Sequence, residues 1–266
     1  MKVFIFGKTG LIGRNMFIPQ DEADVEEADY IIHAGGYGQP AKFMADEITT
    51  ISVNTTKLIE LLGKMKKTAK FLFLSTSEVY SGSIPPYKEN QIGTTSPMHQ
   101  RACYIESKRC GEAICMAYRR LGYDVKIARL SLAYGGAKKG DGRVLNQFVE
   151  QALTKKKIQL LDKGEAKRTY IYVEDAVSIL WDILFKGMQP VYNVGGVSKT
   201  TIAGLAYTIA KLTDSEVVLG DKGLEVAPED VSMDISLVLN EFGQRELTSL
   251  EEGLKKTITW TKNMLA

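Results

Sequence analysis

The chain opens with the stretch Val3-Phe4-Ile5-Phe6-Gly7-Lys8-Thr9-Gly10-Leu11-Ile12-Gly13. The apolar residues predict a buried β-strand. The glycines that follow allow a tight turn, close approach of a diphosphate to the backbone, and close packing of the next helix. The free N–H groups at the start of that helix favour phosphate. We therefore predict a dinucleotide-binding loop with contacts from Gly7, Thr9, Gly10, Leu11, Ile12 and Gly13; the alternative is a tight turn that binds nothing.

The connection after this loop is too short for a complete nucleotide-binding unit. Only fifteen residues, 14–28, separate Gly13 from the next clear strand, Asp29–His33. A complete unit has a second strand here, ending in an acidic residue about 20 residues on that binds the adenosine ribose. The acidic residues of the connection do not end a credible strand, and we interpret them as solvated: Asp21, Glu22, Asp24, Glu26 and Glu27. The sequence thus predicts a Rossmann fold truncated near strand 2.

The strand Asp29–His33 runs into Ala34-Gly35-Gly36, where small side chains let the backbone approach a cofactor. His33, Ala34 and Gly35 are therefore candidate cofactor contacts, with a packed strand-end residue as the alternative for His33. A helix is expected over Glu47–Gly63 and carries Asn54.

A second motif, Tyr104-Ile105-Glu106-Ser107-Lys108, lies on a helix expected over Cys103–Leu121. Residues four apart share a helix face, so the phenol and the ammonium point the same way. A free tyrosine has a pKa of about 10, and a nearby cation favours the phenolate and lowers that value. Thr76 follows the apolar strand Phe71–Leu74 and can orient a substrate hydroxyl. Alone, the motif also fits a surface tyrosine beside a solvated lysine.

Strands and helices alternate up to about Leu130, which predicts an α/β fold with a doubly wound parallel sheet. Shorter, mixed elements follow and indicate a smaller C-terminal α/β lobe that binds substrate. We divide the chain into a dinucleotide-binding domain, 1–135, and a substrate lobe, 136–266, with some elements returning to the first domain. The irregular stretch Ser81–Gln100 contains three prolines and is expected to lie over the site.

The composition excludes several other classes. The 266 residues include 34 basic and 32 acidic side chains, so the net charge of +2 gives no general case for nucleic acid or an anionic membrane. The three cysteines lie on one expected helix and predict no disulfide framework, which favours the cytoplasm. No apolar stretch reaches the ~18 residues that a membrane span needs, and no metal site is predicted.

Taken together, the motifs resemble the extended short-chain dehydrogenase/reductase family, which includes nucleotide-sugar epimerases, dehydratases and decarboxylases. The resemblance covers nearly the whole chain. Its markers are Gly7-x-x-Gly10-x-x-Gly13, Asn54, Thr76-Ser77-Glu78-Val79-Tyr80, Tyr104-x-x-x-Lys108, Arg129 before Tyr134-Gly135, and Arg168 before Tyr172-Val173-Glu174-Asp175. Thr76–Tyr80, Ala102–Tyr104 and Asp141-Gly142-Arg143-Val144 most resemble the UDP-glucuronate decarboxylase branch.

The resemblance implies NAD as cofactor, with NADP open, and a nucleotide sugar as substrate. Tyr104 would take a proton from a sugar hydroxyl, usually at C4, as hydride passes to nicotinamide, and the hydride would later return. Lys108 would bind the nicotinamide ribose and Thr76 would orient the hydroxyl. Glu78 stands where dehydratases have a base, or is a structural carboxylate. A homodimer, paired through the helices of 47–63 and 103–121, is also implied.

Substrate contacts are expected from Thr76, Ser77, Arg143 and Arg168, the arginines because guanidinium groups suit phosphates; both arginines could instead be exposed. Three features depart from the family. The second strand is missing, Leu132 replaces a substrate-binding asparagine, and the segment Val231–Ile235 lacks an arginine. Ser77 also replaces the aspartate of 4,6-dehydratases. We therefore place epimerisation first, decarboxylation second, and a non-catalytic nucleotide-binding protein third.

Overall fold

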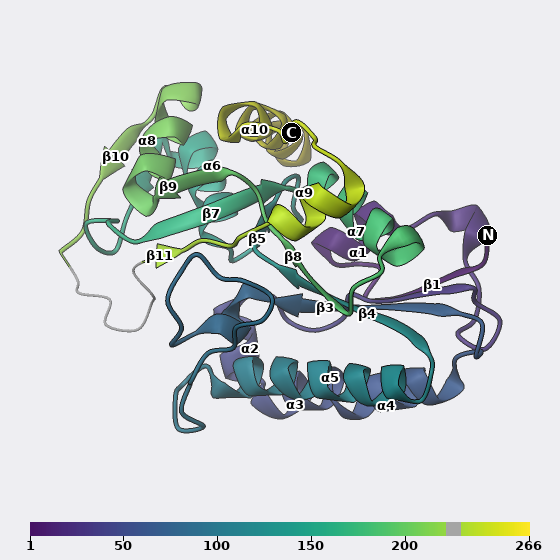
Figure 1. Cartoon of the computed structure of the whole chain (residues 1–266). Helices are drawn as coiled ribbons and strands as arrows, with labels where there is room; N and C mark the ends of the chain where they lie inside the picture. Colours follow the sequence, from purple (N-terminus) through teal and green to yellow (C-terminus); the bar gives the residue numbers. More distant parts are fainter. Residues whose placement is uncertain (222–229) are drawn as a thin grey trace.

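The computed structural model describes residues 1–221 and 230–266. Its central element is a five-stranded sheet in the order β1-β2-β3-β4-β8, in which every neighbouring pair is parallel (Figure 1). The strands are β1 (Val3–Phe6), β2 (Tyr30–His33), β3 (Lys70–Thr76), β4 (Asp124–Leu130) and β8 (Val191–Val194). The predicted α/β fold with a doubly wound parallel sheet is confirmed, because helices cover both faces of this sheet.

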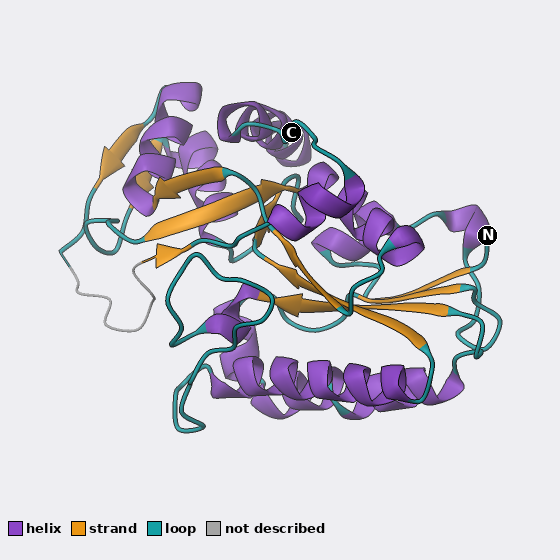
Figure 2. Cartoon of the chain, in the orientation of Figure 1, coloured by secondary structure: helices purple, strands orange, loops and turns teal. Residues whose placement is uncertain are grey.

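One face of the sheet is covered by α3 (Glu47–Asn54), α4 (Thr56–Lys64) and α5 (Ala102–Arg120), and the other by α1 (Leu11–Met16), α7 (Val173–Lys186) and α9 (Ser236–Phe242) (Figure 2). A single helix over 47–63 was expected. The structure divides it at Thr55, whose φ of −124° and ψ of −75° interrupt the helix. Apolar residues of the sheet pack separately against α4 and α5 and against α7.

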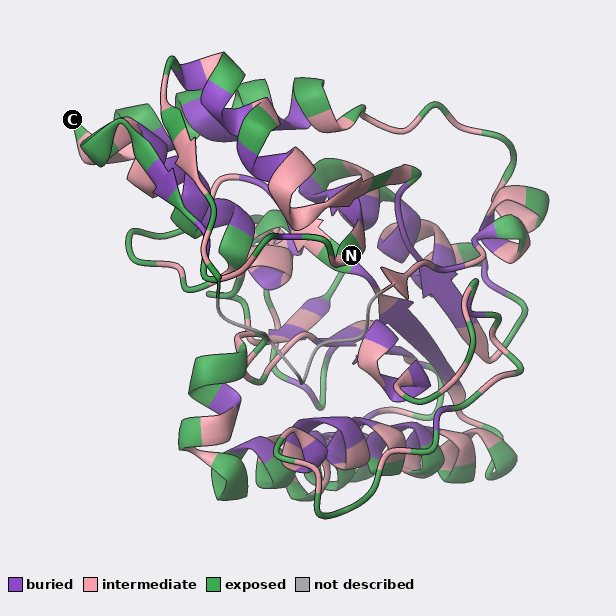
Figure 3. Ribbon diagram, turned by 90° about the vertical axis from the view of Figure 1, so that its left-hand side faces the viewer, coloured by how far each residue is buried: buried purple, intermediate pink, exposed green. Residues whose placement is uncertain are grey.

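A second layer of elements has its own apolar core. It comprises α6 (Val144–Lys155), α8 (Ile202–Thr213) and α10 (Leu250–Leu265) with six short strands: β5 (Leu132–Tyr134), β6 (Lys157–Gln159), β7 (Lys167–Tyr172), β9 (Ser198–Thr201), β10 (Glu216–Val218) and β11 (Asp230–Val231). Figure 3 shows buried positions in both parts of the molecule. The chain leaves the main sheet after β4 and returns to it through α7, β8 and α9.

Some short elements differ from expectation. The sequence of 133–136 predicts a turn, but Ala133 and Tyr134 belong to β5, because Tyr134 pairs with Tyr172 and is buried in the smaller core. The helix α2 (Pro40–Ala45) was not predicted; Pro40 occupies its first turn, where a proline costs no hydrogen bond. The strand β9 was also missed.

The sheet ends at β1. Between α1 and β2 the chain forms only a short 3-10 turn, Pro19–Asp21, and one isolated parallel bridge between Val3 and Glu22. The prediction of a Rossmann fold truncated near strand 2 is therefore confirmed. No helix among the described residues is long and apolar enough to cross a membrane.

Candidate functional site

A cavity of about 1050 Å³ lies at the carboxyl ends of the sheet strands and extends to the smaller core. Such a volume is at the upper end of the ~300–1,000 Å³ typical of ligand pockets. Its lining includes fourteen predicted site residues: Gly7, Thr9, Gly10, Leu11, Ile12, Ala34, Gly35, Thr76, Ser77, Glu78, Tyr104, Lys108, Arg143 and Arg168. The structure thus brings together residues that lie up to 161 positions apart in the sequence, from Gly7 to Arg168.

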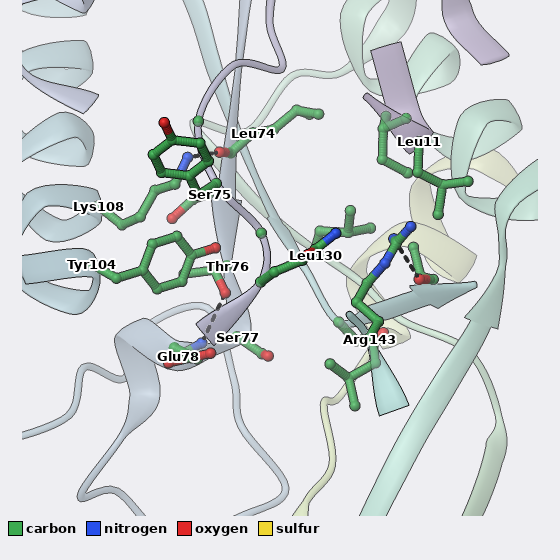
Figure 4. A pocket seen from close by; sticks show the side chains of 18 of the residues that line it. Leu11, Leu74, Ser75, Thr76, Ser77, Glu78, Tyr104, Lys108, Leu130 and Arg143 are labelled. Atoms are coloured by element: carbon green, nitrogen blue, oxygen red, sulfur yellow. Dashed lines mark hydrogen bonds between the residues drawn. The ribbon is translucent and has the colours of Figure 1, made fainter. Parts of the chain in front are cut away.

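Four of these residues form one wall of the cavity, where β3 ends beside α5 (Figure 4). Lys108 donates from Nζ to the carbonyl oxygen of Leu74 over 2.7 Å, which fixes the side chain against the strand end. Thr76 Oγ1 accepts from the backbone N–H of Glu78 over 3.2 Å and thereby caps the turn Ser77–Tyr80. We call Thr76, Glu78, Tyr104 and Lys108 the β3–α5 wall.

The Tyr104 ring is stacked on Phe43 of α2, with ring centroids 4.5 Å apart and planes inclined by 4°. The Arg101 guanidinium lies over the Phe43 ring at 5.4 Å. Phe43 is buried, so the unexpected helix α2 supplies a flat apolar surface that holds the phenol in one plane.

The electrostatics of the wall differ from the sequence-based prediction. Burial raises the pKa of Tyr104 well above its usual value, Glu78 raises it further, and a hydrogen bond with Thr76 and the charge of Arg101 oppose them. Burial also lowers the pKa of Lys108 to about 7. The prediction that Lys108 lowers the phenol pKa is therefore wrong for the protein's own groups, because the low-polarity surroundings disfavour both charged forms.

Glu78 forms an ion pair with Arg101 at the lower end of the wall. Burial raises the pKa of Glu78, while the charges of Arg101 and Arg168 lower it. The two arginines belong to segments far apart in the sequence and both line the cavity.

A buried network behind the wall supports it. Arg129 of β4 donates to both carboxylate oxygens of Glu112 on α5, over 2.9 and 2.7 Å. Its Nη1 also donates to the Tyr80 hydroxyl over 2.8 Å, and Ser75 donates to Glu112 over 2.6 Å. Arg129 was noted only as a marker of resemblance; here it joins β4, α5 and the turn after β3.

The glycine loop is shaped by close backbone contacts. Gly7 has a φ of +90°, and a Cβ there would lie 2.6 Å from the backbone of Ala34 and Gly35. A Cβ on Gly13 would lie 2.2 Å from the carbonyl oxygen of Gly7, whereas Gly10 faces more open space. Gly7 and Gly13 therefore set the loop's shape, and Gly10 leaves its backbone open toward the cavity.

Three predicted cofactor contacts do not line the cavity. Gly13 packs against the loop from behind. His33 is buried between Phe6 and Phe73, with ring centroids 5.0 and 5.3 Å away, and burial lowers its pKa to about 3. Asn54 donates to the Ser107 hydroxyl over 3.0 Å and so links α3 to α5. The packed interpretation of the His33 side chain is therefore confirmed.

Sequence reasoning missed several cations of the lining. Eight described lining residues are lysine or arginine and only two are carboxylates, which favours anionic ligands. The missed cations are Arg14, Lys42, Arg101, Lys138 and Lys139. Arg14 directly follows the last loop glycine, and Lys138 and Lys139 lie in 137–143, a polar, glycine-rich stretch expected to form a substrate loop. Lys42 and Arg101 had no such signal.

The match to known families now decides the classification. Residues 20–195 match the model described as "NAD dependent epimerase/dehydratase family". The chain belongs to this family. The matched region begins after the glycine loop, at the connection where the sheet is shortened. The resemblance stated from the motifs is therefore confirmed.

The chain is similar to curated UDP-glucuronic acid decarboxylases. Decarboxylase 1 of Xenopus tropicalis is 32% identical over 245 residues, 90% of this chain and 58% of that protein. Decarboxylase 6 of Arabidopsis thaliana is 31% identical over 235 residues, 86% of this chain and 68% of that protein. The chain spans under three fifths of the length of the Xenopus relative.

Solved structures show the same fold. A UDP-glucuronic acid 4-epimerase from Bacillus cereus, in complex with UDP-glucuronic acid and NAD, has a TM-score of 0.86 at 18% identity and covers 99% of this chain and 100% of its own. A UDP-glucose 4-epimerase from Thermotoga maritima, with UDP-glucose, has a TM-score of 0.85 at 21% identity, with both chains fully covered.

Proposed function

We propose that this chain is an NAD-dependent nucleotide-sugar enzyme that transiently oxidises a sugar hydroxyl, at C4, and then reduces the carbon again. One observation carries the proposal: Thr76, Tyr104 and Lys108 lie on one wall of a cavity whose other end is the glycine loop. A module that only binds nucleotides has no use for a tyrosine and a lysine gathered in this way.

The residues of the β3–α5 wall have distinct roles. Thr76 and Tyr104 receive the sugar hydroxyl between their oxygens, and Tyr104 takes its proton as the C–H bond breaks. Lys108 holds the strand end through Leu74 and presents a polar group to the nicotinamide ribose. The bound NAD would supply the hydride acceptor and later return the hydride. Burial raises the pKa of Tyr104 and lowers that of Lys108, so the phenol loses its proton only where a positive charge in the loaded site offsets that burial.

The cofactor's fit is asymmetric. The open backbone at Gly10, with Thr9, Leu11, Ile12, Ala34 and Gly35, suits a diphosphate and the nicotinamide ribose. The cationic lining, including Arg143 and Arg168, suits the diphosphate of a nucleotide sugar, with Ser77 beside the sugar.

Epimerisation is the first reaction class and decarboxylation of UDP-glucuronate the second. The second is favoured by the Thr76–Tyr80 motif and by the similarity to curated decarboxylases. It is weakened by Val231–Ile235, which brings no arginine to the cavity.

The test is incubation of the purified chain and NAD with UDP-glucuronate and with UDP-glucose, followed by mass spectrometry and proton NMR. An inverted C4 centre identifies an epimerase, and a pentose product with carbon dioxide identifies a decarboxylase. If neither sugar nor a wider set of nucleotide sugars is changed, and Tyr104→Phe alters no measurable activity, the protein is a non-catalytic nucleotide binder.

Three accompanying proposals are separately testable. A homodimer through α3, α4 and α5 is supported by the exposed Ile48, Ile51 and Ile59, and light scattering after size exclusion would detect it.

A cytoplasmic location is supported by three free cysteines, and cell fractionation tests it. The division at residue 135 is tested by limited proteolysis.

A further inference from the structure

The sheet ends where the adenosine half of a dinucleotide is normally held. In a complete Rossmann unit, a strand beyond the first carries the acid that binds the adenosine ribose. Here β1 is the outermost strand, and its outer edge meets only the bridge between Val3 and Glu22 (Figure 1). Val3 is the first residue of β1, so this bridge lies at the opposite end of the strand from Gly7.

Four of the five acidic residues of the connection are held in ion pairs. Asp21 contacts the amino terminus over 3.4 Å, Glu26 contacts Lys64 over 3.4 Å, and Glu27 contacts Lys2 over 2.8 Å. Glu22 is paired with Lys8. None of these carboxylates is among the described residues that line the cavity. These ion pairs tie the connection to the start of β1 and, through Glu22, to Lys8 of the glycine loop, and none of the four carboxylates faces the cavity.

Next to the glycine loop, the described lining consists of small or uncharged residues together with lysine and arginine side chains. The loop after β2 contributes Gly36, Tyr37, Gly38 and Gln39, followed by Lys42. The lining carboxylates are Glu78, on the β3–α5 wall, and Asp141, which accepts two hydrogen bonds from the Arg143 guanidinium over 2.8 and 2.7 Å. Both are engaged by arginines, so neither is free to receive the two ribose hydroxyls.

We infer that this chain holds its dinucleotide by the nicotinamide ribose and the phosphates, and leaves the adenosine outside the walled cavity. This inference rests on the proposed function. Two consequences follow from the geometry. The protein does not discriminate between NAD and NADP by the 2′-phosphate, because the strand that would contact that position is missing from the described sheet. The cofactor also exchanges with solution, because the anchoring contacts of adenosine are lost.

The test measures binding and not turnover. The 266-residue chain is titrated with NADH, NADPH and reduced nicotinamide mononucleotide by ligand fluorescence, and with ADP by displacement of NADH. We expect the dissociation constant of the mononucleotide to lie within about tenfold of that of NADH. In a complete site the contacts of the missing strand with adenosine would make the difference larger. NADPH should bind within about threefold of NADH, and ADP at least about a hundredfold more weakly.

Two variants make the result specific. Lys108→Met should weaken NADH and the mononucleotide by the same factor, because both carry the nicotinamide ribose. Glu22→Gln should leave the ratio of the two affinities unchanged; a selective loss of NADH affinity in Glu22→Gln would show that the connection does bind the adenosine ribose.

The outcomes separate the two proposals. NADH binding more than about a hundredfold tighter than the mononucleotide, or a tenfold preference between NADH and NADPH, overturns this inference and leaves the proposed function standing. A chain that binds none of the four ligands overturns the proposed function together with it.

Discussion

The β3–α5 wall and the outer edge of β1 border the same nucleotide-binding unit but differ in completeness. The wall holds Thr76, Tyr104 and Lys108 together, backed by a buried network around Arg129. The edge of β1 lacks a neighbouring strand within the described sheet, and its acidic residues are used in ion pairs. In the proposed enzyme, proton transfer and cofactor discrimination therefore depend on separate parts of the Rossmann sheet, so that one part can be shortened while the other is kept.

The largest effect should come from the reacting group of the wall. Tyr104→Phe removes the phenol that takes the proton, and a positioned acid–base group contributes about 10²–10⁴-fold to rate. We expect kcat to fall by about a thousandfold, while the dissociation constant of NADH changes by less than about threefold. Steady-state kinetics and fluorescence titration measure the two quantities.

Tyr118→Phe is the matched control, because Tyr118 lies on the same helix and does not line the cavity. It should retain full activity. A Tyr104→Phe enzyme with near-normal kcat would remove the proposed distinction between the wall and the edge.

The second effect tests whether the wall depends on its buried support. Arg129→Leu leaves the Glu112 carboxylate buried without its cation, and breaking such a pair costs about 3–5 kcal/mol. We expect the free energy of unfolding in urea to fall by about that amount. The double variant Arg129→Leu/Glu112→Leu should recover part of the loss. If the double variant is no more stable than Arg129→Leu, the pair is not coupled as the structure shows.

The third effect concerns the pH dependence of stability. The pKa of Lys108 is about 7 in the folded chain and 10.5 as an unperturbed side chain, with burial as the main cause. Between these values the unfolded chain binds more protons, so the free energy of unfolding rises with pH; below about 7 both states carry the proton.

Relative to Lys108→Met, the wild type should therefore gain stability as pH increases from about 7 to about 9, by at most about 1.4 kcal/mol per pH unit. Urea unfolding at several pH values measures this slope. Lys211→Met, on an exposed part of α8, should leave the slope unchanged. If the difference in free energy of unfolding between wild type and Lys108→Met does not change with pH, the lysine stays protonated in the folded chain.

The smallest effect concerns the position of the phenol. Phe43→Leu removes the ring stacked on Tyr104 but keeps an apolar side chain. We expect kcat to fall by about tenfold with little change in KM, because an aromatic pair contributes about 0.5–1.5 kcal/mol. Phe148→Leu, which removes a buried ring from the smaller core, should reduce stability and leave kcat unchanged. Equal kcat values for the two variants would contradict a positioning role for Phe43.

The sequence predicted the parts of the fold and site that local pattern determines. The apolar strands and the glycine loop gave the parallel sheet, and the spacing of Tyr104 and Lys108 placed both on one helix. The short connection 14–28 was enough to predict the missing strand. These features depend on periodicity and chain length, which a single sequence shows directly.

The remaining features depend on contacts between distant segments. Phe43 is separated from Tyr104 by 61 residues, and nothing in the local pattern of Pro40–Ala45 indicates a ring stacked on the phenol. The pKa of Tyr104 is raised, opposite to the prediction from the neighbouring charge, because burial of both Tyr104 and Lys108 outweighs that charge. Asn54 and His33 were predicted to contact the cofactor, and the side chains of both are buried outside the cavity lining.

The shortened sheet also changes how the molecule meets other chains. An outermost strand with unpaired backbone groups is a template for edge-to-edge association and aggregation. Among the described residues, β1 is such an outermost strand, and beyond the bridge at Val3 its outer edge pairs with no other strand. Ion pairs of Asp21 with the amino terminus and of Glu27 with Lys2 lie at the start of β1. They disfavour such association, since another strand could pair there only by displacing them.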